Sequence, residues 1–181
     1  HAPEGLDAGD SRLLIVEDTL AALECLGSTA RRRTDARVVA VTGSVGKTGA
    51  KEMLRLTLGA LGACHASEGN LNNHWGAPLS MARMPRDADY AAFELGMNHP
   101  GEIRPLVKLA RPDVVIITRI AAAHTAFFDS IEAVADAKAE IFEGLTSGGV
   151  AVLNADDPMI DRLTDAAMAA GVSSILRFGE V

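Results

Sequence analysis

A glycine-rich turn between a short β-branched run and a helical segment constrains the fold more than any other feature of the chain. The run covers residues 37–42, the turn residues 43–46 and the helical pattern residues 47–61. A strand that enters a helix through such a turn is typical of phosphate-binding loops, in which backbone N–H groups and the helix N-terminus face an anion. The order of these segments therefore predicts an α/β protein with a phosphate-binding loop.

The turn carries the side chains that suit a nucleoside triphosphate. Its members are Gly43, Ser44, Val45, Gly46, Lys47 and Thr48. The glycines let backbone N–H groups close around phosphate oxygens, Lys47 reaches the outer phosphates, and Thr48 can hold Mg²⁺. The usual pattern has a glycine five positions before Gly46, where this chain has Val41, so the loop is a shortened form. We expect nucleotide binding rather than an ordinary glycine turn.

Strands and helices alternate along the rest of the chain. Strands are predicted at 90–95, 113–118, 149–154 and 173–178, and helices at 18–33, 77–84, 102–110, 130–145 and 158–170. The strands are nearly continuous apolar runs, as in parallel sheets whose two faces are covered by helices. The prediction is a doubly wound, mostly parallel sheet, with residues 68–76 as a long loop.

Charge and composition narrow the classes of function. The net charge of −7 gives no reason to expect binding to nucleic acid or to an anionic membrane. No apolar stretch reaches the roughly 18 residues of a membrane span, and the first residues do not resemble a signal peptide. Cys25 and Cys64 lack the spacing of a metal site or a disulfide framework, which suits a reducing compartment. We expect a cytoplasmic protein.

Two candidate metal ligands follow strands at the edge where parallel sheets bind ligands. Glu94 ends one apolar run, and His124 follows the strand at 113–118 at the same carboxyl edge. Loop geometry can therefore bring Thr48, Glu94 and His124 around one cluster of metal and phosphate. On position alone, a solvated glutamate and a surface-loop histidine are the alternatives.

Lys138 interrupts an apolar helical stripe. The stripe consists of Ile131, Val134, Ala135, Ile141, Phe142 and Leu145. One interpretation is a lysine whose stem is buried and whose ammonium group reaches water. The other is a desolvated lysine with a lowered pKa, which can react as a free amine.

Asparagines are concentrated in the predicted loop at 68–76. Asn70, Asn72 and Asn73 offer amide donors and acceptors that can reach over the crevice at the sheet edge. Asparagines in loops more often form turns. Alone, these residues are weak candidates for substrate binding.

The motifs, in their order, resemble those of the Mur ligases. They occupy residues 42–48, 51–54, 69–73, 94–98, 101–103, 123–124, 137–141 and 154–157. The blocks at 69–73 and 94–103 are similar to those of the member that joins D-alanyl-D-alanine to UDP-N-acetylmuramoyl-tripeptide in cell-wall synthesis. The resemblance implies an ATP-dependent amide ligase that acts through an acyl phosphate, with two Mg²⁺ ions and those two substrates. We expect a monomer.

The resemblance also implies roles for individual residues. It makes Lys47 a phosphate ligand, Thr48 a ligand of one Mg²⁺, and Glu94 and His124 ligands of a second. Lys138 matches the lysine that CO₂ carbamylates in this family, and the resulting anion helps to hold the second Mg²⁺. The three loop asparagines match a segment near the substrate. Lys47, His124 and Lys138 are the expected catalytic residues.

A domain organisation follows from the same resemblance. Residues 1–35 are similar to the end of the family's amino-terminal substrate domain and a linker helix, and residues 36–181 to part of its central ATP-binding domain. The carboxy-terminal domain is expected to be absent, which makes the chain a piece of a longer ligase. The sequence departs from the family at Gly49, Arg119 and Ala126, where threonine, asparagine and glutamate are common.

Two other functions stay open at this point. One is a sister amide ligase, either another Mur enzyme or folylpolyglutamate synthase, although the asparagine block argues against it. The other is a catalytically silent fragment that binds nucleotide but does not close around substrates. A phosphate-loop kinase or GTPase fits less well, because the loop is short and no base-reading motif occurs.

Overall fold

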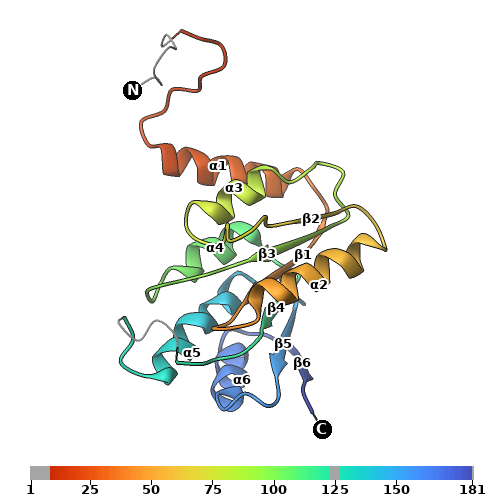
Figure 1. Cartoon of the computed structure of the whole chain (residues 1–181), viewed down its shortest axis with the longest axis vertical. Helices are drawn as coiled ribbons and strands as arrows, with labels where there is room; N and C mark the ends of the chain where they lie inside the picture. Colours follow the sequence, from red (N-terminus) through yellow and green to blue (C-terminus); the bar gives the residue numbers. More distant parts are fainter. Residues whose placement is uncertain (1–8, 123–126, 181) are drawn as a thin grey trace.

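A computed structural model describes residues 9–122 and 127–180 of the chain (Figure 1). Its elements are α1 (Thr19–Arg32), β1 (Arg37–Thr42), α2 (Lys47–Gly59), β2 (Cys64–Ala66), α3 (Gly76–Ala82), β3 (Tyr90–Glu94), α4 (Ile103–Ala110), β4 (Val114–Ile117), α5 (Ile131–Ala139), the 3₁₀ helix η1 (Glu140–Gly144), β5 (Val150–Asn154), α6 (Ile160–Ala169) and β6 (Ser174–Phe178). In this part of the chain six strands form one sheet in the order β2-β3-β1-β4-β5-β6, and every neighbouring pair is parallel. The predicted parallel α/β sheet is confirmed.

The strand order reverses at β1, and this reversal places the glycine-rich turn. β1 lies between β3 and β4, with Val41 paired to Glu94 on one side and to Ile116 on the other. Right-handed crossovers put α2 on one face of the sheet and the helices α3 to α6 on the opposite face. Sheets of this kind bind ligands at the carboxyl ends of the strands beside the reversal. The turn after β1 and the end of β3 meet at that edge.

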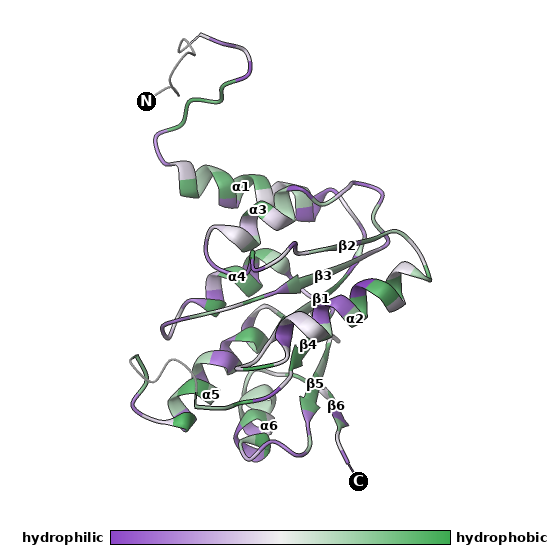
Figure 2. Ribbon diagram, in the orientation of Figure 1, coloured by the Kyte–Doolittle hydropathy of each residue, from purple (hydrophilic) through white to green (hydrophobic). Residues whose placement is uncertain are grey.

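The core lies between the strands and the helices that cover them. Its fully buried side chains include Val38, Ala40, Met81, Ala91, Phe93, Val115 and Leu153. Figure 2 shows mostly hydrophobic strands and amphipathic helices, with hydrophobic residues on one side and hydrophilic residues on the other. In β4 and β5 buried residues alternate with half-buried ones, and Leu176 and Phe178 of β6 are exposed. Among the described residues, one face of this half of the sheet is therefore well packed and the other partly open.

Two local features differ from the sequence-based expectations, and a third agrees with them. Nothing in the sequence predicts β2, because three residues without branched side chains give no alternating pattern. The helix expected at 130–145 changes to a 3₁₀ helix at Glu140. The loop expected at residues 68–76 agrees with the structure to within one residue, because α3 begins at Gly76.

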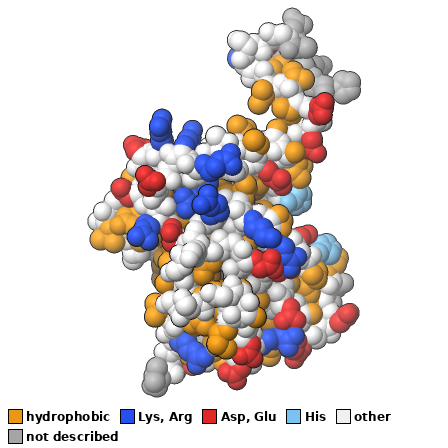
Figure 3. All heavy atoms as spheres, turned by 180° about the vertical axis from the view of Figure 1, so that it is seen from behind, with side chains coloured by type: hydrophobic (Ala, Val, Ile, Leu, Met, Phe, Trp, Pro, Cys, Tyr) orange, Lys and Arg blue, Asp and Glu red, His pale blue; other side chains and the backbone are white. Residues whose placement is uncertain are grey.

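The surface carries both signs of charge. On the face shown in Figure 3, acidic side chains lie among the basic ones, with hydrophobic side chains between them. None of the helices in the described part of the chain has the length and apolar character needed to cross a membrane.

Candidate active site

The turn after β1 adopts a conformation that requires glycine at two positions. Gly43 has a φ of +150° and Gly46, which caps α2, a φ of +84°. A Cβ atom on Gly43 would lie 2.0 Å from Thr118 Oγ1. Any side chain at position 43 would therefore collide with the segment that follows β4.

The same turn is fixed to the segment after β4 by hydrogen bonds. Ser44 N donates to Arg119 O over 2.7 Å, Ser44 Oγ donates to Ala121 O over 3.0 Å, and Thr118 Oγ1 donates to Val45 O over 2.6 Å. Arg119 contributes its backbone carbonyl to this arrangement, which any residue at that position can supply. The departure from the family's asparagine at 119 thus leaves these contacts intact. These three bonds fix the position of the turn relative to the segment after β4.

Lys47 begins α2 and lies at the rim of a pocket. Its Nζ donates to Gly43 O over 2.8 Å, so the side chain folds back over the glycine-rich turn. Burial lowers the pKa of Lys47, and the negative charge of Glu94 opposes that shift. The position suits a cation that neutralises phosphate oxygens at the helix N-terminus.

Glu94 is a buried carboxylate held from two sides. Its side chain is 2% exposed; Thr48 Oγ1 donates to Glu94 Oε2 over 2.8 Å, and Asn72 Nδ2 donates to Glu94 Oε1 over 2.7 Å. Gly96 permits the approach of Asn72, because a Cβ atom at 96 would lie 2.9 Å from Asn72 Cγ. The structure thus brings the predicted residues Thr48, Glu94 and Asn72 together.

The three loop asparagines have different environments. Asn72 binds Glu94, as described above. Asn73 lines the pocket, but its Oδ1 accepts the backbone N–H groups of Trp75 and Gly76 at the start of α3, which is the turn-forming behaviour expected of loop asparagines. Asn70 is exposed and is not among the residues that line the pocket.

Lys138 is buried in the apolar stripe that the sequence indicated. It is 1% exposed, and its pKa is lowered to about 7, first because burial disfavours the ammonium form and second because of the positive charge of Lys47. The interpretation of a desolvated lysine fits better than that of an ammonium in water.

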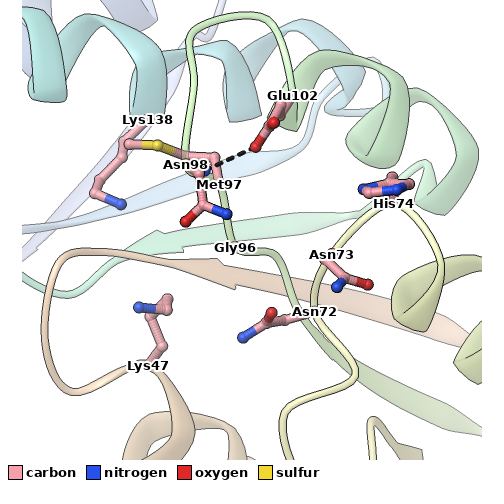
Figure 4. Close-up of a pocket in the computed structure, with 9 residues that line it drawn as sticks. All are labelled: Lys47, Asn72, Asn73, His74, Gly96, Met97, Asn98, Glu102 and Lys138. Carbon is pink, nitrogen blue, oxygen red and sulfur yellow. Dashed lines mark hydrogen bonds between the residues drawn. The ribbon is translucent and has the colours of Figure 1, made fainter. Parts of the chain in front are cut away.

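These side chains surround one pocket of about 250 Å³. Its lining residues are Lys47, Asn72, Asn73, His74, Gly96, Met97, Asn98, Glu102 and Lys138 (Figure 4). Lys47 and Lys138 approach the pocket from opposite walls, and Asn72 lies beside them. Lys47 gives this end of the pocket a positive charge, which suits a phosphate or carboxylate group.

The sequence did not single out every residue of the pocket. His74, Met97, Asn98 and Glu102 were missed as site residues, although each lies inside or directly beside a motif block. Glu102 Oε2 accepts Asn98 N over 2.7 Å, so Glu102 shapes the wall that carries Asn98. His124, predicted as a metal ligand, lies outside the described residues, as does Ala126.

Comparisons with known proteins bear on this site. The family model described as the Mur ligase middle domain matches residues 41–181. The UDP-N-acetylmuramoyl-tripeptide–D-alanyl-D-alanine ligase of Escherichia coli (strain K12) is 46% identical over 144 residues, which are 80% of this chain and 32% of that protein. The ligase of the same name from Rickettsia prowazekii is 37% identical over 168 residues, 93% of this chain and 37% of that protein. The chain spans about a third of the length of these relatives.

Solved structures give the same result. MurF from Acinetobacter baumannii has a TM-score of 0.83 and 35% identity, over 92% of this chain and 36% of that chain. The MurF ligase from Thermotoga maritima in complex with ADP has a TM-score of 0.82 and 29% identity, over 96% of this chain and 40% of that chain. The chain belongs to the Mur ligase family, and residues 41–181 match the middle domain of that family.

Proposed function

We propose that the protein is an ATP-dependent ligase that joins D-alanyl-D-alanine to UDP-N-acetylmuramoyl-tripeptide, with ADP and phosphate as the other products. The observation that carries the proposal is the pocket in which Lys47, Lys138 and Asn72 meet beside the buried carboxylate of Glu94. The names of the similar ligases and the ADP bound to the T. maritima relative support it.

The first chemical step is phosphoryl transfer. A carboxylate oxygen of the tripeptide attacks the γ-phosphorus of ATP, a P–O bond forms, and the bond to the β,γ-bridging oxygen breaks, so that ADP leaves and an acyl phosphate remains. Lys47 and the N–H groups of the turn neutralise the charge that builds up on the phosphate oxygens. The protein contributes position and electrostatic stabilisation, without a covalent nucleophile of its own.

The second step is amide formation. The amine of D-alanyl-D-alanine attacks the acyl carbon, a C–N bond forms, the C–O bond to phosphate breaks, and the amine loses a proton. The loop that contains Asn72 and Asn73 lies along the same pocket and orients the acyl group in this proposal. We infer no role in substrate binding for Asn70, which is exposed.

Mg²⁺ fits the oxygen donors at the end of β3. The Thr48 hydroxyl and the Glu94 carboxylate lie within hydrogen-bond distance of each other, and Mg²⁺ prefers such hard oxygen ligands together with phosphate and water. In this proposal Thr48 holds one ion, and Glu94, His124 and carbamylated Lys138 hold a second. When bound, the ions supply positive charge that stabilises the transferring phosphoryl group. A neutral Lys138 amine is the form that reacts with CO₂.

A chimeric ligase tests the proposal. Residues 41–181 replace the equivalent segment of the E. coli ligase, and the chimera is expressed in cells depleted of that enzyme. We expect growth with the wild-type segment and no growth with Lys47→Ala in the same chimera. Lys108→Ala, a change at an exposed lysine, is the matched control. Failure of the folded wild-type chimera to support growth, or growth with Lys47→Ala, would contradict the proposal.

A further inference from the structure

α2 contains a second lysine, Lys51, whose side chain is fully buried. Lys51 is 0% exposed and is the one buried residue of α2 within the described structure. It lies one helical turn after Lys47, on the side of the helix that faces the sheet. A charged group in such a position carries a large desolvation penalty, so its contacts must compensate.

Those contacts lead from the phosphate-loop helix to the end of β2. Lys51 Nζ donates to Ser67 O over 2.6 Å and lies 2.9 Å from Glu52 Oε1. Ser67 is 2% exposed and directly follows β2, at the start of the loop that carries Asn72. The lysine therefore ties the first residue of that loop to α2.

The chain of contacts continues from Ser67 to Glu94. Glu94 N donates to Ser67 Oγ over 3.3 Å, and Ser67 N donates to Ala92 O over 3.0 Å. Glu94 in turn accepts from Asn72, further along the same loop. One buried ammonium group thus connects the helix of the phosphate loop with the backbone that carries the Glu94 carboxylate.

We propose that Lys51 is a positioning residue, whose contact with Ser67 holds Glu94 and the loop of residues 67–75 in place relative to the phosphate loop. Lys51 touches neither nucleotide nor metal in this account. Its effect on metal–nucleotide binding rests on the proposed function, whereas its effect on the loop does not. The two parts are therefore tested separately.

The loop is tested without any ligand. Trp75, the only tryptophan of the chain, ends this loop and is 46% exposed, so acrylamide quenching of its fluorescence reports how tightly the loop is held. Lys51→Met keeps the apolar stem and removes the ammonium group, and should raise the quenching constant roughly twofold as the loop loosens. Lys108→Met, the same change at an exposed lysine, should leave it unchanged. Equal quenching in both variants would overturn the positioning role.

Metal–nucleotide binding is tested by calorimetry with ADP, in EDTA and in Mg²⁺. We expect the gain in affinity on adding Mg²⁺ to fall about tenfold in Lys51→Met, with Mg²⁺-free binding unchanged, because Glu94 is misplaced. Lys51→Arg, which keeps the charge and the donors, should restore most of the gain. If Lys51 only stabilised the fold, Lys51→Met would lower the melting temperature but show the same Mg²⁺-dependent gain in ADP affinity as Lys108→Met. That result would refute the inference.

Failure of the proposed function and failure of the positioning role of Lys51 give different results. If the wild-type chain binds no ADP, the proposed function fails, and the quenching of Trp75 still decides the role of Lys51. If circular dichroism shows that Lys51→Met does not fold, Ser67→Ala takes its place, since it removes the hydroxyl that accepts Glu94 N–H. We expect Ser67→Ala to reduce the Mg²⁺-dependent gain, and an unchanged gain would overturn the inference.

Discussion

Thr48 and Glu94 are joined by a hydrogen bond of 2.8 Å between Thr48 Oγ1 and Glu94 Oε2. This bond connects the first turn of α2 to the last residue of β3, two elements that are far apart in the sequence. It exists because β1 and β3 are neighbours with their carboxyl ends at the same edge. The pair is the proposed centre of metal binding.

Glu94→Gln tests that centre. The variant keeps an acceptor for Thr48 but loses the negative charge, so we expect the affinity gain from Mg²⁺ in nucleotide titrations to fall by about tenfold or more. Glu68→Gln is the matched control, because the Glu68 side chain is 79% exposed. A Mg²⁺ effect of equal size in the two variants would rule out Glu94 as a metal ligand.

Gly43→Ala should destabilise the fold and abolish nucleotide binding. The new Cβ would collide with Thr118 Oγ1, and the φ of +150° is unfavourable for alanine, so the free energy of unfolding should fall by about 1–3 kcal/mol. Gly49→Ala makes the same change in α2, where nothing lies within 4 Å, and should raise stability by about 0.5–1 kcal/mol. Urea denaturation measures both. A Gly43→Ala variant as stable as the wild type would contradict the described turn.

Asn72→Asp should destabilise the chain near neutral pH. It replaces a donor 2.7 Å from Glu94 Oε1 with a second carboxylate, and loss of such a bond to a charged group costs about 1.5–3 kcal/mol. Repulsion raises a carboxyl pKa in the folded state, so the folded variant binds a proton more tightly than the unfolded chain and recovers stability as the pH falls. Asn70→Asp, at an exposed position, should change neither the stability near neutral pH nor its dependence on pH. Equal stability of the two variants across pH would argue against the contact.

The lowered pKa of Lys138 predicts that the stability of the chain depends on pH. Its pKa is about 7 in the folded chain and 10.5 in the absence of burial, so between these values the unfolded chain binds more protons. Stability should therefore rise with pH from about 7 towards 10.5, with a slope of up to about 1.4 kcal/mol per pH unit from this residue. Lys138→Met should remove that part of the slope, and Lys108→Met should retain it. Chemical denaturation at several pH values gives the comparison, and identical slopes would count against a desolvated amine.

The sequence predicted the features that depend on local pattern. The strand–turn–helix order around Gly43 and Gly46 identified the phosphate loop. The apolar stripe singled out Lys138 but left open whether its ammonium group reaches water or is desolvated, and the structure, in which Lys138 is 1% exposed, favours the second. The proximity of Thr48 and Glu94 followed from the rule that parallel strands end at one edge. These predictions needed no knowledge of how the loops run.

Features that depend on loop paths or on short elements were not predictable. β2 is three residues long, so its pairing is decided by β3 rather than by its own composition. Asn72 and Asn70 look equivalent in the sequence, and the close approach at Gly96 separates them. Lys51 has other charged residues beside it in α2, and nothing in the local pattern separates it from them; in the structure it alone is fully buried there and donates to Ser67 O.

The central claim is that residues 43–48 hold a nucleotide. Isothermal titration of Mg·ATP into this chain, into Lys47→Ala and into Lys108→Ala tests it most directly. We expect one bound nucleotide in the wild type and in Lys108→Ala, and an affinity lower by about 10- to 100-fold in Lys47→Ala, as for a lost charged contact to phosphate. No binding to the wild type, or equal binding in Lys47→Ala, would contradict the account.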